Sequence, residues 1–447
     1  MWTVAQLNAE LASGATTSRE LVEQAFGRIV DPAGEGARAF VKLYAESARG
    51  EADFADRLRK SGVRRSPVDG LPVALKDLFD VAGDVTRAGS RIFAGHPPAK
   101  ADAPAVARLR AAGAIFIGRN NMVEFAFGGV GLNPHFGTPK NPYDRATGRV
   151  PGGSTSGGAV AQADGMCVMA LGSDTRGSIR QPAALCGVTG FKPTARRVPR
   201  EGAFPLSFTL DSVGPLANSV ACCAVYDAIL AGEKPEPLPE IPAKGLRLLL
   251  PRSGALDDLD AYVTRNFVAT LSRLAKAGAL LTEVKVPAFD RQNEYFKGGG
   301  FAGAEAYYVH RPYLSRVAEY DPRVGKRVMM GKDFSAADYF ALGELRAAYI
   351  REVEGALAPF DAMIMPTVPC MAPTIAETEA SDDEYFRWNF RIMRNTGLIN
   401  FLDGCAVSVP CHAKGAPPVG LMVCGAAMSD RRTLAVAAAI EQALARD

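Results

Sequence analysis

Hydrophobic and polar positions follow a helical spacing near the start of the chain. Apolar residues fall on one face of VAQLNAEL (4–11), and Thr17 followed by Glu20 forms a capping-box pattern ahead of LVEQAFGRI (21–29). We therefore expect residues 1–65 to form a small helical N-terminal part.

The pattern then changes to short apolar runs of strand length. LPVALKDLFDVAG (71–83) and AIFIGRNNM (114–122) are two such runs, separated by the helical pattern APAVARLRAAG. This order predicts a βαβ unit and a sheet that is at least partly parallel. MCVMALGSD (166–174) predicts a buried strand that ends near Gly172, and DTRGSIRQPAALCG then predicts a tight turn and a helix with the turn apex in the open.

The second half of the chain repeats the alternation of strands and helices. KGLRLLLP (244–251), the helical YVTRNFVATLSRLAKAG and LLTEVKVP predict a continuation of the same sheet. Residues 233–383 as a whole are richer in aromatic residues and helical patterns, which predicts a helical cap over the sheet that sets substrate specificity. FDAMIMPTVP (360–369) and the segment 405–425 predict buried strands, and RRTLAVAAAIEQAL predicts a closing helix.

Composition and charge exclude several classes of protein. Of 447 residues, 48% are hydrophobic and 22% charged, which is typical of a globular chain and excludes a disordered one. The net charge is +3 and no long Lys/Arg run occurs, so we expect no nucleic-acid partner, no membrane anchor and no polyanionic substrate. Eight cysteines without a CxxC pair predict buried thiols, and the start of the chain lacks a secretory signal, so we expect a cytoplasmic protein.

The histidines and glycine-rich segments argue against three common kinds of site. The chain has four histidines, His96, His135, His310 and His412, and none lies in an HExxH or GxSxG context. GGSTSGG (152–158) lacks the lysine of a phosphate-binding loop. We therefore expect no metal and no cofactor, and a hydroxyl nucleophile that uses a base other than histidine.

Lys76 and Ser178 are the residues that suit such chemistry. Lys76 directly follows an apolar strand run, where desolvation lowers the pKa of an amine; the alternative is a structural salt bridge to Asp77 or Asp80. Ser178 lies on the turn between a strand and a helix, where backbone N–H groups can hold an oxyanion; the alternative is that it only caps the helix.

Three segments resemble, in order and spacing, those that define the amidase signature family. They are GLPVALKD (70–77), PGGSTSGG (151–158) and the segment 170–194, ALGSDTRGSIRQPAALCGVTGFKPT. The resemblance extends over nearly the whole chain and implies a single amidase domain over residues 1–447. The implied fold is α/β, with a large mixed central β-sheet flanked by helices on both faces.

The resemblance also implies a catalytic triad and its supporting residues. Lys76, Ser154 and Ser178 occupy the triad positions, with the family's spacing of 24 between the serines. Backbone N–H groups of the turn are expected to form the oxyanion hole, and the Gly153–Ser154 bond is expected to be cis. These assignments comprise the oxyanion donors Thr175, Arg176, Gly177 and Ser178 and the supporting loop residues Gly152, Gly153 and Thr155.

Two departures from the family pattern limit the resemblance. Thr155 replaces a frequent Ser, and Arg176 stands where the family commonly has Gly. The Arg176 side chain either pairs with a carboxylate or narrows the substrate pocket. Met122 and Phe125 are candidates for that pocket, although aromatic residues in such segments are more often core. The aromatic candidates considered are Phe125, Phe127, Tyr295, Phe296, Tyr307 and Tyr308.

The implied activity is hydrolysis of the C–N bond of a small or aryl carboxamide, extending to carbamates or esters. The alternative within the family is the A subunit of a tRNA-dependent amidotransferase, which releases ammonia from glutamine. A catalytically inactive binding protein on the same fold is a third hypothesis, which the three filled triad positions argue against. Relatives are often dimers, so a homodimer is a further expectation.

Overall fold

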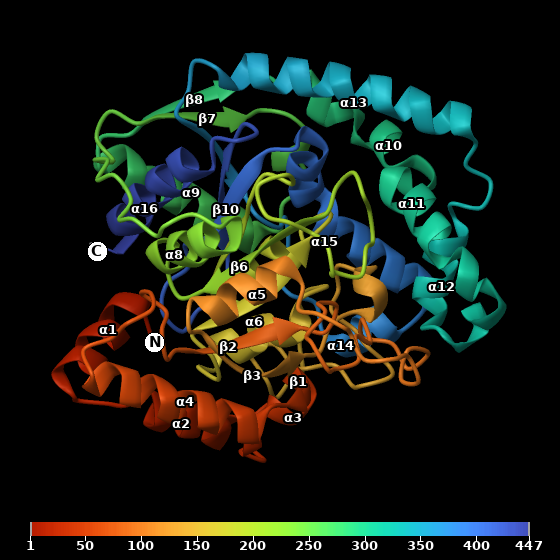
Figure 1. Cartoon of the computed structure of the whole chain (residues 1–447). Helices are drawn as coiled ribbons and strands as arrows, with labels where there is room; N and C mark the ends of the chain where they lie inside the picture. The colour runs from red at the N-terminus through yellow and green to blue at the C-terminus, as the bar shows by residue number, and fades with distance from the viewer. Residues whose placement is uncertain (1, 446–447) are drawn as a thin grey trace.

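One mixed β-sheet forms the centre of the molecule in a computed structural model that describes residues 2–445 (Figure 1). Its eleven strands lie in the order β1-β3-β2-β4-β6-β5-β10-β11-β9-β7-β8. The strands are β1 (Phe40–Leu43), β2 (Pro72–Lys76), β3 (Ile115–Asn120), β4 (Met169–Asp174), β5 (Thr189–Lys192), β6 (Ser212–Ala217), β7 (Arg247–Pro251), β8 (Leu280–Val284), β9 (Ala362–Pro366), β10 (Cys405–Pro410) and β11 (Gly420–Gly425). β2 pairs in parallel with both β3 and β4, whereas β4 and β6 are antiparallel. The sheet is therefore mixed, as expected.

Helices cover both faces of this sheet. They are α1 (Val4–Ser13), α2 (Ser18–Val30), α3 (Gly36–Ala39), α4 (Ala45–Lys60), α5 (Pro104–Ala111), α6 (Ser156–Ala163), α7 (Arg180–Cys186), α8 (Val220–Ala231), α9 (Ala261–Lys276), α10 (Gln292–Tyr295), α11 (Gly300–His310), α12 (Pro322–Met329), α13 (Ala336–Leu357), α14 (Ile375–Glu379), α15 (Asp382–Leu402) and α16 (Asp430–Ala445). The capping box predicted at Thr17 and Glu20 is present at the start of α2.

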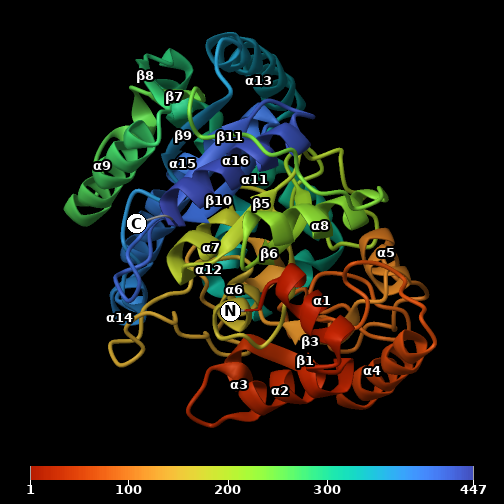
Figure 2. The ribbon, with the colours of Figure 1, turned by 90° about the vertical axis from the view of Figure 1, so that its left-hand side faces the viewer.

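The alternation of side chains along β2 separates two hydrophobic layers. Val73 and Leu75 pack in a cluster with residues of α5, α8 and α16. Ala74 packs on the opposite face with residues of α2, α4 and α6. Because successive side chains of a strand point to opposite faces, Lys76 shares the face of Ala74 and α6. Figures 1 and 2 show the two helical layers on either side of the strands.

The predicted βαβ unit is confirmed, because β2, α5 and β3 follow one another and the two strands are parallel. The predicted continuation of the sheet is also confirmed, since β7 and β8 are parallel neighbours joined by α9. Residues 233–383 are consequently not a purely helical unit: they supply β7, β8 and β9 to the sheet. The helical segment α10–α13 lies between β8 and β9 and forms the upper right border of the molecule in Figure 1.

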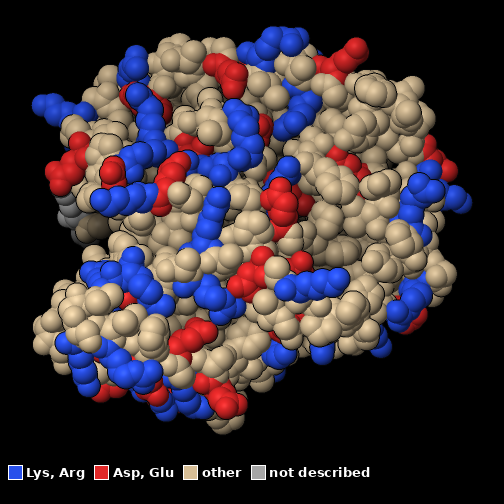
Figure 3. Space-filling view, viewed as in Figure 1, with Lys and Arg blue, Asp and Glu red and all other residues tan. Residues whose placement is uncertain are grey.

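Charged side chains of both signs are interspersed over the face drawn in Figure 3. All eight cysteines are buried and free, as expected. Within residues 2–445, no helix combines the length and apolar character needed to cross a membrane.

Candidate active site

Lys76 is the last residue of β2 and is fully buried. Its Nζ lies 2.7 Å from Ser154 Oγ and 2.9 Å from Ser173 Oγ. The two alternative partners have other contacts: Asp77 accepts a hydrogen bond from the Gly89 N–H and lies 3.6 Å from Arg119, and Asp80 accepts one from the Thr86 hydroxyl. The structural salt bridge considered for Lys76 is therefore absent from the described residues, and the lysine contacts two hydroxyl groups.

Burial has a large effect on the Lys76 amine. Desolvation lowers its pKa from 10.5 to about 7, against the opposing influence of the Asp174 and Asp211 carboxylates. A lysine with this pKa is substantially neutral near pH 7 and therefore has a lone pair to accept a proton. Its partner Ser173 also lines a cavity of about 300 Å³ together with Phe208 and Asp211, so the buried amine lies close to that cavity.

The 151–158 loop has the backbone geometry predicted for it. The Gly153–Ser154 bond is cis. The Gly152 N–H donates to Val130 O and the Gly153 N–H donates to Gly129 O at 2.7 Å. A Cβ on Gly153 would lie 2.9 Å from the Gly131 nitrogen. The glycines therefore permit close packing of the loop against the 128–131 segment.

Ser178 lies on the turn between β4 and α7, called the Ser178 turn below (residues 175–178), and is 6% exposed. Its carbonyl oxygen accepts a hydrogen bond from the Thr155 N–H at 3.2 Å, which brings the turn next to Ser154. α7 begins at Arg180 without a side-chain cap, so the interpretation of Ser178 as a helix cap is wrong.

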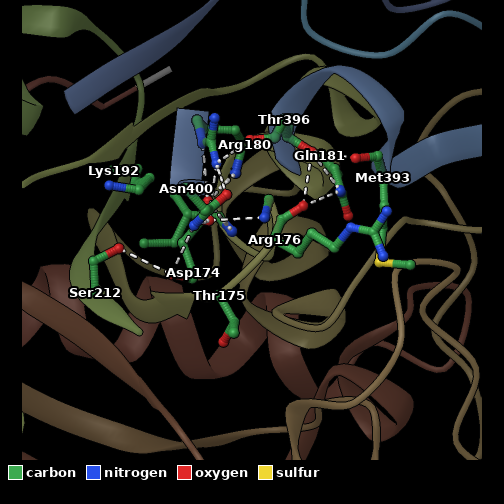
Figure 4. A network of polar contacts seen from close by, with 12 residues as sticks. Asp174, Thr175, Arg176, Arg180, Gln181, Lys192, Ser212, Met393, Thr396 and Asn400 are labelled. Carbon is green, nitrogen blue, oxygen red and sulfur yellow. Dashed lines mark hydrogen bonds and ion pairs between the residues drawn. The ribbon is translucent and has the colours of Figure 1, made fainter. Parts of the chain in front are cut away.

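Asp174 fixes the shape of this turn from inside. Its carboxylate accepts hydrogen bonds from the backbone N–H groups of Gly177 at 2.7 Å and Ile179 at 3.2 Å. It also forms an ion pair with Arg180 at 2.9 Å and accepts from the Asn400 amide at 2.8 Å (Figure 4). These cationic and amide donors hold the pKa of Asp174 well below its usual range although desolvation opposes them. The Ser178 turn is thus built on a buried charge pair.

The Asp174 contact changes one of the predicted oxyanion donors. A backbone nitrogen has a single hydrogen to donate, and that of Gly177 is directed at Asp174. Gly177 instead permits the backbone conformation of the turn. Its φ is +121°, and a Cβ at this position would lie 2.2 Å from Thr396 Oγ1. Thr175, another predicted donor, is anchored through its hydroxyl to Asp211.

The Arg176 side chain leaves the turn on the side away from the Asp174 network and extends towards Met393 (Figure 4). Its Cζ lies 3.6 Å from the centre of the Phe296 ring. Its carbonyl oxygen is held by the Gln181 amide and the Thr396 hydroxyl, both at 2.8 Å. The expectation that Arg176 pairs with a carboxylate is not met by any described residue.

Met122 and Phe125 are fully buried. Phe125 packs among other aromatic rings, with its centroid 4.5 Å from that of His310 and 4.9 Å from that of Tyr320. These contacts place it in the core, which is the alternative that we considered for the aromatic candidates. Of the remaining candidates, Phe296 contacts Arg176, whereas Tyr308 is 62% exposed.

Sequence reasoning missed the residues that hold the Ser178 turn. Asp174 and Arg180 lie six positions apart, but Arg176 between them is an equally near base, so the sequence does not show which arginine pairs with Asp174. Ser173 lies in the same stretch, but nothing local marks its hydroxyl as a partner of Lys76. Asn400 lies more than 200 positions along the chain from Asp174, and no pattern relates the two.

Comparison with known proteins finds relatives over nearly the whole chain. The family model for Amidase matches residues 20–434. The chain is 36% identical to 2-amino-5-chloromuconic acid deaminase of Comamonas testosteroni, over 88% of this chain and 86% of that protein. It is 34% identical to the A subunit of glutamyl-tRNA(Gln) amidotransferase from Anaeromyxobacter dehalogenans (strain 2CP-C), over 98% and 95%. An amidase crystal structure superposes with a TM-score of 0.88 at 33% identity and covers 99% of both chains.

The family match covers more than half of the chain, and the fold agrees with that of a solved amidase. The residues predicted from the resemblance lie on one loop, one strand end and one turn that contact each other. The chain therefore belongs to the amidase signature family and is a hydrolase of carbon–nitrogen bonds other than peptide bonds.

Proposed function

We propose that the protein hydrolyses the C–N bond of a small or aryl carboxamide through a covalent seryl intermediate on Ser178. The observation that carries this proposal is the 2.7 Å contact between Ser154 Oγ and a fully buried Lys76 whose pKa is about 7. A neutral lysine can accept the Ser154 proton along this contact, and Ser154 can in turn accept the proton of the attacking serine.

In the first half of the reaction, Ser178 Oγ attacks the carbonyl carbon and its proton passes to Ser154, whose own proton passes to Lys76. The N–H groups of Thr175, Arg176 and Ser178 hold the oxyanion; elsewhere one such donor contributes about 3 to 4 kcal/mol. When the C–N bond breaks, the leaving nitrogen takes a proton from Ser154, which Lys76 resupplies. An acyl ester on Ser178 and a free amine result.

In the second half, water attacks the ester carbonyl carbon. Ser154 and Lys76 take the water proton along the same route and return it to Ser178 Oγ as the ester bond breaks. The acid is released and the three residues regain their starting protonation states. The same steps serve carbamates and esters, because each has a carbonyl carbon and a leaving heteroatom.

The test is turnover of a panel of aliphatic amides, anilides, carbamates and esters, read as released amine or alcohol. Ser178→Ala is expected to lower the rate by at least about 10⁴-fold. Ser253→Ala is the matched control, because Ser253 is a buried serine that bonds to Val286 and follows β7, which lies seven strands away from β2 in the sheet. If Lys76→Ala and Ser178→Ala both leave turnover unchanged, the mechanism is refuted.

The relatives named as the A subunit of glutamyl-tRNA(Gln) amidotransferase favour a second candidate. In that case the chain hydrolyses glutamine and passes ammonia to a partner protein. Glutamine turnover that depends on a co-purified partner and on charged tRNA identifies this function. Amide turnover by the isolated chain, without either addition, identifies the first.

A further inference from the structure

Arg176 and Arg327 are two cations whose environment differs from that of the other buried arginines. Arg180 pairs with Asp174 at 2.9 Å, and Arg119 pairs with Asp84 at 2.7 Å. Neither Arg176 nor Arg327 makes an ion pair with any carboxylate of residues 2–445. Buried charges are normally paired, so two unpaired guanidinium groups in the same region need an explanation.

Arg176 is joined to the Ser178 turn by its own backbone. It precedes Ser178 by two positions, and its Nε is buried without a hydrogen-bond acceptor. The Phe296 ring covers one face of the guanidinium, and α15 approaches it so closely that a Cβ on Gly397 would lie 3.0 Å from its Nε. The guanidinium is thus held in place while a donor stays unused.

Arg327 approaches the site from α12, on the side of the 151–158 loop. It is 5% exposed, its Nη1 donates to Phe127 O at 3.0 Å, and its Cζ lies 4.1 Å from the Phe127 ring centre. Phe127 is two residues before Gly129, whose carbonyl accepts from the Gly153 N–H. Phe127 and Gly129 therefore connect Arg327 to the loop that carries Ser154.

A second buried donor without a partner belongs to the same region. Asn389 of α15 accepts the Gly129 N–H through its Oδ1 at 2.7 Å, and its Nδ2 is buried without a partner. A Cβ on Gly129 would lie 2.7 Å from Met393 Cγ and 3.1 Å from Gln181 Oε1, and Gln181 bonds to the Arg176 carbonyl. The segments that carry Arg176 and Asn389, and the 127–129 segment that Arg327 contacts, therefore converge beside the Ser178 turn.

The two guanidinium groups are destabilised by this arrangement. Desolvation lowers the pKa of Arg176 to about 9, and the nearby charge of Arg327 contributes to this shift. Desolvation also lowers the pKa of Arg327 to about 10. An anion placed between them removes the like-charge repulsion and fills the empty donor positions. A carboxylate fits best, because guanidinium forks match its two oxygens.

We propose that Arg176, Arg327 and the Asn389 amide bind a free carboxylate of the substrate, so that the preferred substrates are amides that carry a carboxylate near the scissile bond. This inference rests on the proposed amide hydrolysis and specifies its substrate class.

The first experiment compares succinamate, glutaramate and terephthalamate with neutral counterparts in which a methyl ketone replaces the carboxylate. Released ammonia gives kcat and KM for each member of a pair. We expect kcat/KM to be at least about tenfold higher for the carboxylates, since a charged hydrogen bond is lost in the neutral member. Equal turnover of both members, or faster turnover of the neutral one, overturns the inference and leaves the proposed hydrolysis intact.

The second experiment tests the arginines. Arg176→Gln and Arg327→Gln are expected to lower the preference for the carboxylate member, measured as the ratio of the two kcat/KM values within a pair, by about tenfold or more, chiefly through a higher KM for the carboxylate. Arg327→Lys is expected to restore part of the preference. Arg316→Gln is the control, because Arg316 is exposed and already paired with Glu319. Equal losses on both members indicate a structural role and overturn the inference.

A binding measurement separates failure of this inference from failure of the proposed function. If no amide of either kind is hydrolysed, the proposed function fails, and succinate and terephthalate are then tested as ligands by calorimetry. Binding that Arg176→Gln and Arg327→Gln abolish and Arg316→Gln preserves still supports the carboxylate site. Absence of binding to the wild-type protein overturns it.

Discussion

Removing the Ser173 hydroxyl should move the pH dependence of catalysis to lower pH. Ser173 Oγ lies 2.9 Å from Lys76 Nζ and accepts a hydrogen bond from the ammonium form of this fully buried lysine. Loss of a hydrogen bond to a charged group costs about 1.5 to 3 kcal/mol, and one pKa unit corresponds to about 1.4 kcal/mol. The neutral amine also bonds to the hydroxyl, which offsets part of the loss. We therefore expect Ser173→Ala to lower the pKa of Lys76 by about one unit.

The assay is the pH profile of kcat/KM, which reports groups of the free enzyme. Lys76 acts when neutral, so the wild-type rate should rise with pH and reach half its plateau near pH 7. The variant should reach half its plateau near pH 6, where the neutral fraction of Lys76 rises from about one tenth to about one half. Its relative activity at pH 6 should increase about fivefold even if the plateau itself is lower.

Ser253→Ala is again the control, because it removes a buried serine hydroxyl remote from Lys76 and should leave the midpoint unchanged. A midpoint for Ser173→Ala that stays near 7 or moves upward refutes the reasoning. Either result means that Ser173 does not stabilise the charged form, or that Lys76 is not the group that limits the rate at low pH.

Three further substitutions test the charge pair, the turn and the buried amine. Asp174→Asn leaves Arg180 as an uncompensated buried charge and should lower the free energy of unfolding by about 3 to 5 kcal/mol in urea titrations; a loss below about 1 kcal/mol contradicts this. Gly177→Ala places a Cβ 2.2 Å from neighbouring side-chain atoms and should abolish turnover, whereas Gly343→Ala in α13 places a Cβ with no atom within 4 Å and should keep full activity. Lys76→Met should abolish turnover but raise the free energy of unfolding at pH 6 by up to about 5 kcal/mol. The pKa of Lys76 is about 7 in the folded protein and 10.5 in the unfolded chain, so between these pH values the unfolded chain binds one proton more. The buried lysine therefore lowers the free energy of unfolding by its full amount below pH 7, and Lys76→Met removes that cost. Equal increases in the free energy of unfolding at pH 6 and above pH 10.5 refute this expectation.

Local hydrophobic patterns in the sequence predicted much of the fold. The apolar runs of 71–83 and 114–122 with the helical pattern between them predicted β2, α5 and β3 correctly. The strand, turn and helix around Ser178 were predicted correctly as well, but the turn is buried and not in the open as expected, with Ser178 only 6% exposed, because α15 packs against it. These predictions succeed because hydrophobic periodicity and turn residues act within a dozen positions. The composition of residues 233–383 was less informative: aromatic richness and helical patterns predicted a helical cap, although three of its segments are sheet strands.

The sequence by itself determined where the reacting groups come from. A lysine that ends an apolar strand is desolvated wherever the sheet packs, and glycines at 152 and 153 permit the close approach of the 128–131 segment. Only the tertiary structure determined which residues these groups contact. Ser173 is 97 positions from Lys76, Asn400 is 226 from Asp174, and Arg327 is 200 from Phe127. Such contacts leave no periodic trace in the chain, because their geometry depends on how the sheet orders its strands and on which helices pack across its face.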